Sequence, residues 1–183
     1  RFAATVYDFT KRFDPDRPCV DVSGGVHGGK TDLFDFHSYE KLDDLQRYFR
    51  ELDEEDRLEV PLLYCEKTDP RYRKGQPVAF SECGGIALAA EYATAETSEV
   101  NRGAVLSESG WGYGKREKEG EEFVARYEKL RTLVQSVKKL SGFCYTQLYV
   151  GEQEVNGFFR ADRRDNLTES QKHRIREVNL KRV

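Results

Sequence analysis

Apolar residues recur along the chain in two patterns. Spacings of three and four residues predict helices, and short apolar runs that end at glycine, proline or charged residues predict strands. The predicted helices cover residues 2–13, 42–52, 123–137 and 169–178. The predicted strands cover residues 19–23, 33–37, 78–82 and 143–148. Because strands separated by helices and long connections are typical of parallel pairing, the pattern predicts an α/β fold.

One connection is too long for an ordinary loop. It covers residues 86–114 and contains the glycine-rich stretch Ser109-Gly110-Trp111-Gly112-Tyr113-Gly114. Connections of this length are usually functional loops or disordered segments, and we expect one of the two here.

The number of predicted strands is half of that in a larger fold. Four strands with three crossovers amount to half of a (β/α)8 TIM barrel, which needs about 250 residues. The chain has 183 residues, contains no methionine and begins within a helical pattern, so we expect a piece of a longer protein. We therefore predict that residues 1–183 are a partial barrel domain with two open edges, which is a liability in isolation.

Charge and composition exclude several classes of partner. The net charge of −3 and the pI of about 5.8 disfavour binding to nucleic acid or to a membrane surface. No apolar run reaches the roughly 18 residues of a membrane span. The four cysteines lack metal-ligand spacing and the three histidines are scattered, so we expect no metal. Unpaired cysteines favour a reducing compartment such as the cytoplasm.

Each predicted strand has a polar residue at or next to its C-terminal end: Ser23, His37, Glu82 or Gln147. Ligands of α/β proteins bind at this end of the strands, which makes the coincidence informative. Each residue also has a simpler interpretation. Glu82 could cap the following Gly84-Gly85 turn, and His37 could satisfy a local hydrogen bond. Trp111 could stack on a sugar or anchor its loop.

Several motifs together resemble those of glycoside hydrolase family 2, which contains β-galactosidases, β-glucuronidases and β-mannosidases. The matching stretches are Phe13-Asp14-Pro15-Asp16-Arg17-Pro18, Val20-Asp21-Val22-Ser23-Gly24, Thr31-Asp32-Leu33-Phe34-Asp35-Phe36-His37-Ser38-Tyr39, Ser81-Glu82-Cys83-Gly84-Gly85-Ile86, Trp111-Gly112-Tyr113-Gly114, Gly142-Phe143-Cys144-Tyr145-Thr146-Gln147-Leu148 and Glu152-Gln153-Glu154-Val155-Asn156-Gly157. They occur in the family's order over nearly the whole chain. One departure is Cys83, where the family usually carries an aromatic residue.

The resemblance implies a retaining β-glycosidase that acts on a carbohydrate substrate and needs no cofactor. The chain would supply barrel strands five to eight, with Glu82 as the catalytic nucleophile. The family's general acid/base belongs to an Asn-Glu pair on strand four, and this chain contains no such pair. The substrate-binding residues implied are His37, Tyr39, Trp111, Tyr145 and Gln147.

Two other classes of function fit the sequence. The chain could be a non-catalytic carbohydrate-binding module that has kept barrel motifs. It could also be a half-barrel that pairs with another copy through its open edges, which would make the protein a homo-oligomer.

Overall fold

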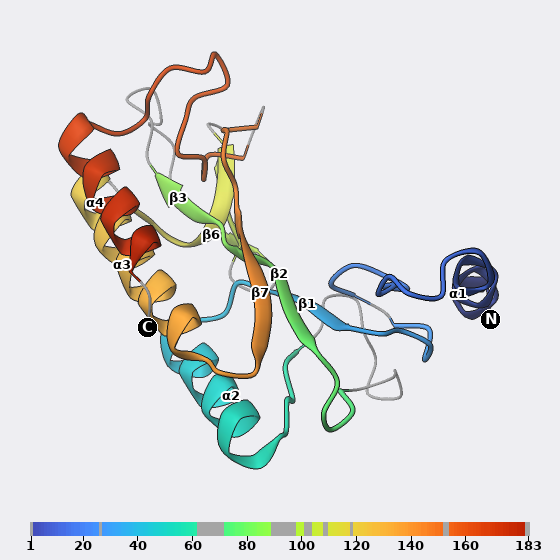
Figure 1. Ribbon diagram of the computed structural model, residues 1–183. Coiled ribbons are helices and arrows are strands. Elements are labelled where there is room, and N and C mark those ends of the chain that lie inside the picture. Colours follow the sequence, from blue (N-terminus) through green and yellow to red (C-terminus); the bar gives the residue numbers. More distant parts are fainter. Residues whose placement is uncertain are drawn as a thin grey trace. The chain divides into compact units, whose positions relative to one another are not determined.

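The computed structural model describes residues 2–25, 27–61, 72–88, 98–100, 104–107, 110–117, 119–151 and 154–181. Within them the chain forms four α-helices and two β-sheets (Figure 1). The helices are α1 (Phe2–Phe13), α2 (Leu42–Glu55), α3 (Gly120–Ser136) and α4 (Glu169–Leu180). The strands are β1 (Phe34–Ser38), β2 (Val78–Gly84), β3 (Ile86–Leu88), β4 (Ser98–Val100), β5 (Ala104–Ser107), β6 (Gly110–Glu117) and β7 (Leu140–Thr146).

The chain divides into two compact units. The first comprises Arg1–Ser38, Leu45–Cys83 and Val137–Cys144, and the second comprises Tyr39–Asp44, Gly84–Ser136 and Tyr145–Val183. Helices and a parallel strand pair occur together, so the predicted α/β class is confirmed. No helix in the described ranges combines the length and the apolar character that a bilayer span requires.

The first unit is built on the sheet β1-β2-β7, in which β1 and β2 run parallel. Its core lies where α2 covers one face of β1 and β2. Phe36 and Phe80 stack with their ring centroids 4.5 Å apart, and Phe49 of α2 meets Phe80 edge-on at 5.6 Å. All three side chains are fully or almost fully buried. In the last turn of α2, Asp53 accepts the backbone N–H groups of Lys138 and Lys139, both at 3.0 Å, just before β7 begins.

A β-bulge separates the buried residues of β2 from its polar end. Phe36 pairs with Phe80, but the next residue, His37, pairs with Glu82, so β2 has one extra residue here. Phe80 therefore packs with Phe36 in the core, while Glu82 shares the opposite face with His37. Strict alternation predicts Phe80 and Glu82 on one face. That prediction is wrong, because the bulge reverses the alternation after Phe80.

The segment from Cys19 to Ser23 is not a strand, contrary to the sequence prediction. Its hydrogen-bond partners are Asp32 and His27, which do not belong to a neighbouring strand. Cys19 donates its N–H to the Asp32 carboxylate at 2.8 Å and accepts the Asp32 N–H at 3.0 Å. Asp21 in turn binds the buried His27. These side-chain contacts replace a strand ladder for this apolar run.

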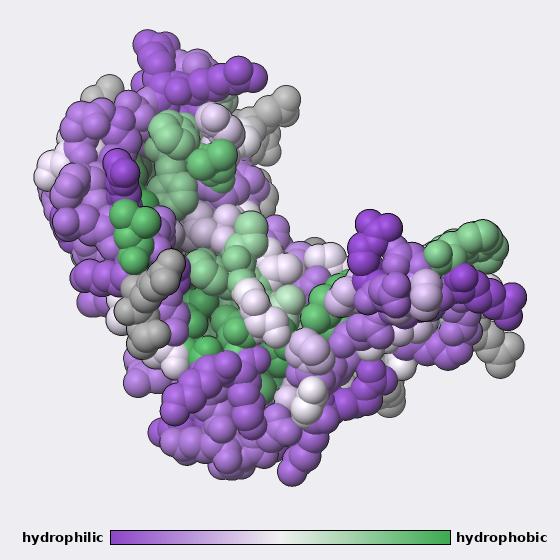
Figure 2. Space-filling model, in the orientation of Figure 1, coloured by the Kyte–Doolittle hydropathy of each residue, from purple (hydrophilic) through white to green (hydrophobic). Residues whose placement is uncertain are grey.

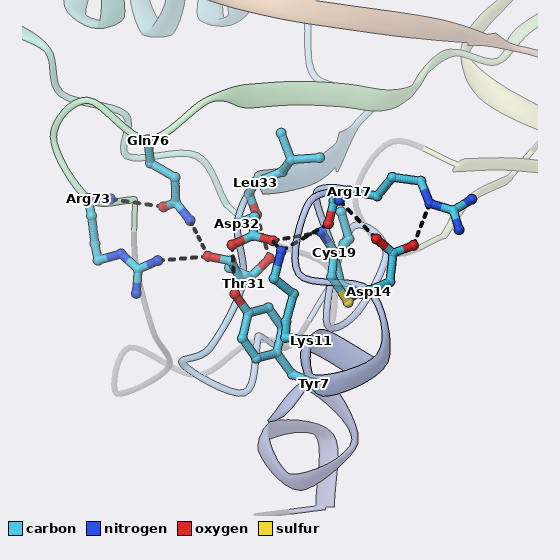
Figure 3. A network of polar contacts seen from close by, with 11 residues as sticks. Tyr7, Lys11, Asp14, Arg17, Cys19, Thr31, Asp32, Leu33, Arg73 and Gln76 are labelled. Atoms are coloured by element: carbon cyan, nitrogen blue, oxygen red, sulfur yellow. Dashed lines mark hydrogen bonds and ion pairs between the residues drawn. The ribbon is translucent and has the colours of Figure 1, made fainter. Parts of the chain in front are cut away.

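Helix α1 forms where the sequence predicts it, but its apolar stripe faces solvent. Phe2 is 84% exposed and Phe13 is 77% exposed, and Val6 and Phe9 are exposed as well. A patch of hydrophobic residues lies over α1 at the right of Figure 2, beside hydrophilic ones. The opposite face of the helix is polar and holds it in place, through Tyr7 and Lys11 (Figure 3).

Asp32 is the centre of the contacts that hold α1. It accepts the Tyr7 hydroxyl at 2.6 Å, and Lys11 lies 3.1 Å from its other oxygen. Lys11 also donates to the Arg17 carbonyl at 2.9 Å (Figure 3). The hydrogen bond from Tyr7 is the main cause that lowers the pKa of Asp32. The same hydrogen bond, followed by burial, raises the pKa of Tyr7 to about 12.

The Tyr7–Asp32 contact predicts a defined alkaline transition. Because the folded-state pKa of Tyr7 exceeds the ordinary value of 10.0, the contact contributes fully below about pH 10 and is lost as the pH rises through about 12. We expect Asp32→Asn to return the titration of Tyr7 toward 10.0. The measurement is tyrosinate absorbance, taken as the difference between the wild type and Tyr7→Phe. A Tyr7 titration at its ordinary value in the wild type would contradict this contact.

The second unit contains the sheet β3-β6-β5-β4 and the helices α3 and α4. The core residues are Ile86, Phe123, Val124, Tyr127, Leu167 and Val178. Arg174 of α4 makes a bidentate ion pair with Glu128 of α3, with N···O distances of 3.0 and 2.6 Å. This unit also contains the stretch 86–114, in which the described residues include four strands. The expectation of a loop or disordered segment there is therefore wrong for those residues.

Candidate active site

Glu82 lies near the end of β2, on the face of the sheet that α2 does not cover. Its Oε2 atom is 2.6 Å from Nδ1 of His37, which occupies the paired position on β1. The two side chains are 33% and 19% exposed, so both can be reached from solvent. Parallel pairing brings the two strand-end residues together, as the sequence predicts for ligand-binding ends of strands.

The second nitrogen of His37 also has a partner. Nε2 lies 3.2 Å from the Oγ atom of Ser23, an exposed residue in the segment before β1. The imidazole ring rests on the backbone of Gly24, which has a φ of +67°. Any Cβ at Gly24 would overlap the ring, so only glycine allows this close approach. His37 is thus held at both nitrogens and on one ring face.

The acids Asp21 and Asp35 have structural partners. Asp35 accepts the hydroxyl of Ser81, the residue that the bulge adds to β2. Asp21 lies 2.8 Å from Nδ1 of His27, whose Nε2 is 2.7 Å from the Asp35 carbonyl oxygen. Burial raises the pKa of Asp21, but hydrogen bonds from His27 and the Gly28 amide outweigh it and leave the pKa below its ordinary value. This cluster fixes the segment that carries Ser23 and Gly24.

The glycine turn Gly84-Gly85 belongs to the second unit and packs against aromatic rings of that same unit. Gly84 and Gly85 both have positive φ, +90° and +53°. A Cβ at Gly84 would overlap the Tyr145 ring, and one at Gly85 would overlap the rings of Tyr113 and Tyr39. Tyr39 and Tyr113 stack face to face, with centroids 3.4 Å apart and planes 2° from parallel. The two glycines are therefore required both by conformation and by close packing.

The remaining predicted substrate-binding residues have these positions. Tyr145 lies in β7 and donates its hydroxyl to the Asn156 carbonyl at 3.3 Å. Gln147 directly follows β7 and is half-buried. Trp111 lies in β6 opposite Leu106, and its side chain is outside the described part of the molecule. Tyr39, Trp111, Tyr145 and Gln147 belong to the second unit, and His37 and Glu82 belong to the first.

Sequence reasoning missed Tyr113 and undervalued Ser23. Tyr113 stands between two glycines in the same short motif as Trp111. The motif therefore offers two aromatic residues that could pack, and the sequence prediction considered only Trp111. Ser23 has the polar type expected of a strand end, but its contact with His37 depends on a turn that the strand prediction did not contain.

The His37–Glu82 pair suits carboxylate chemistry. A carboxylate held by one N–H donor remains partly open to an incoming electrophile, such as the anomeric carbon of a sugar. Among the described residues, no three His, Cys, Asp or Glu side chains form a group that could hold a metal ion. The chain matches no protein-family model, and comparison with curated proteins finds no match. The resemblance to glycoside hydrolase family 2 therefore depends on the motifs alone.

Proposed function

We propose that this chain is the C-terminal part of the catalytic barrel of a retaining β-glycosidase, with Glu82 as its nucleophile. One observation carries the proposal: the strand-end carboxylate predicted from the family motif lies 2.6 Å from the strand-end imidazole of His37. A carboxylate that only capped the glycine turn would need no such partner on the adjacent strand.

The order of the elements supports a barrel. The sheet β1-β2-β7 keeps the strands in sequence order, with α2 between β1 and β2 and α3 between β2 and β7 along the chain. Sequential strands with intervening helices are the repeating unit of a (β/α)8 barrel. We therefore propose that β1 and β2 correspond to the family's strands six and seven, and β7 to strand eight.

The proposed reaction follows the retaining mechanism. Glu82 attacks the anomeric carbon of a β-glycoside and forms a covalent glycosyl-enzyme, while a second carboxylic acid protonates the leaving oxygen. Water then cleaves the glycosyl ester and releases the sugar. The two carboxyl groups of such a site are about 5–5.5 Å apart. The second carboxylate would come from a segment other than these residues, because the family's Asn-Glu pair does not occur here.

The proposal predicts a clear difference between the full-length protein and the 183-residue chain. With nitrophenyl β-glycosides as substrates, the full-length protein should turn over at least one of them, whereas the 183-residue chain alone should not rise above the buffer rate. The reason is that, under the proposal, these 183 residues supply only part of the barrel whose loops form the sugar site, and they lack the family's Asn-Glu pair. Vigorous hydrolysis by the 183-residue chain would show that the acid is misplaced, and an inactive full-length protein would contradict the proposed function.

A further inference from the structure

We infer that His37 is a positioning residue for Glu82 and that Ser23 fixes the tautomer in which it works. The inference deepens the proposed function and depends on it for its catalytic consequence. The observation that carries it is the chain of contacts from Ser23 Oγ through His37 to Glu82 Oε2, at 3.2 Å and 2.6 Å.

The chemistry of the three groups selects one arrangement of protons. An ionised carboxylate only accepts hydrogen bonds, so Nδ1 of His37 must be the donor toward Glu82. In a neutral imidazole the other nitrogen then has a lone pair, and it accepts the Ser23 hydroxyl proton. The opposite tautomer would direct the Nδ1 lone pair at the carboxylate, 2.6 Å away. Ser23 and Glu82 therefore both favour the proton on Nδ1.

The surroundings of the ring keep that arrangement in place. Gly24 lies directly against the imidazole, where a Cβ would overlap the ring. The segment that carries Ser23 and Gly24 is fixed by the buried pair of Asp21 and His27. On the other side, the bulge in β2 places Glu82 opposite His37. A ring fixed at both nitrogens and on one face can hold a partner carboxylate at a defined angle.

This arrangement has two consequences for a nucleophilic carboxylate. The Nδ1–H group stabilises the negative charge of Glu82, which must be ionised to attack. It also restricts rotation of the carboxyl group, so that the attacking oxygen keeps its direction. Misplacement of a reacting group by about 1 Å can cost about 10²-fold in rate. His37 would thus act through Glu82 without touching the sugar's reacting carbon.

Two isosteric amides separate the roles of the two nitrogens. In His37→Asn the side-chain amide can take the place of Nδ1 and still donate to Glu82, whereas in His37→Gln it reaches the place of Nε2 and loses that donor. In the full-length protein we expect His37→Gln to lower kcat about 10²-fold with little change in KM. His37→Asn should recover most of that loss. Equal activity of the two variants would overturn the inference.

A spectroscopic measurement tests the tautomer without reference to activity. In protein labelled with nitrogen isotope in its histidines, imidazole chemical shifts distinguish a proton on Nδ1 from one on Nε2, and His37→Asn identifies the signal. We expect the Nδ1–H form for His37 at neutral pH, and a larger Nε2–H share in Ser23→Ala combined with Glu82→Gln. A predominant Nε2–H form in the wild type would overturn the inference, even if the amide variants failed to fold.

The outcomes also separate this inference from the proposed function. Hydrolysis that survives Glu82→Gln removes the proposed function, whatever the tautomer of His37. Hydrolysis that is lost in Glu82→Gln, together with equal rates in the two amide variants, leaves Glu82 as the nucleophile and removes only the positioning role of His37.

Discussion

Replacing Glu82 by Gln in the full-length protein should lower the hydrolysis of β-glycosides by at least about 10³-fold, because a neutral amide cannot form the glycosyl ester. The fold should persist. Gln has the same size as Glu, and its carbonyl oxygen can accept the Nδ1–H of His37 in place of the carboxylate. The measurement is kcat/KM with an activated aryl glycoside, together with the thermal midpoint of both proteins.

Glu54 provides the matched control for this substitution. It is an exposed glutamate on α2, so Glu54→Gln makes the same change of charge away from the site. We expect its kcat/KM to stay within about twofold of the wild type, because substitutions of exposed residues away from a site or a core usually have small effects. If Glu82→Gln were as active as Glu54→Gln, the assignment of the nucleophile would be wrong.

The largest effect on stability is expected from Phe80→Ala. Phe80 is fully buried between Phe36 and Phe49, and its truncation removes the ring contacts of both neighbours. Loss of a buried Phe costs about 3–5 kcal/mol of the free energy of unfolding. Urea unfolding, followed by circular dichroism, measures the change as a shift in the midpoint.

Phe9→Ala is the control of the same chemical type. Phe9 is 62% exposed on α1, so its replacement should change the free energy of unfolding by less than about 0.5 kcal/mol. The comparison tests whether the apolar stripe of α1 stabilises the folded chain. A loss from Phe9→Ala as large as that from Phe80→Ala would mean that the stripe is packed.

Much of the fold follows from local sequence patterns. The spacing of apolar residues locates all four described helices and, within a few residues, the strands β1, β2 and β7. The pattern cannot say which surface covers an amphipathic face. Phe2 and Phe13 have a core-like spacing, yet α1 is held through Tyr7 and Lys11 on its polar side.

The failures have physical causes that a single segment does not reveal. The apolar run at Cys19 forms no strand, because the Asp32 carboxylate occupies the Cys19 amide that a ladder would use. The strands β3 to β6 were missed, because β3, β4 and β5 have only three or four residues each and β6 contains three glycines. Their stability depends on pairing with one another. The bulge at Ser81 appears only in the register between two strands.

The sequence predicts the central pair of the candidate site, but not the residues that pack around this pair. Both Glu82 and His37 stand at strand ends in the sequence, and parallel pairing then brings them together. The contacts around the pair depend on the geometry of turns, which the secondary-structure propensities of single residues do not specify. Ser23 reaches His37 only because Gly24 adopts a positive φ beneath the ring. Tyr113 stacks on Tyr39 over Gly85, and nothing in their spacing indicates that contact.

The most direct test of the account is to trap the covalent intermediate. An activated 2-deoxy-2-fluoro β-glycoside slows release of the sugar more than its transfer to the nucleophile, so the glycosyl-enzyme of a retaining glycosidase accumulates. Mass spectrometry of the intact full-length protein and of its peptides then locates the sugar. We predict a single adduct on Glu82, absent from Glu82→Gln. An adduct on another carboxylate, or steady hydrolysis with no adduct, would contradict the assignment of Glu82 as the nucleophile.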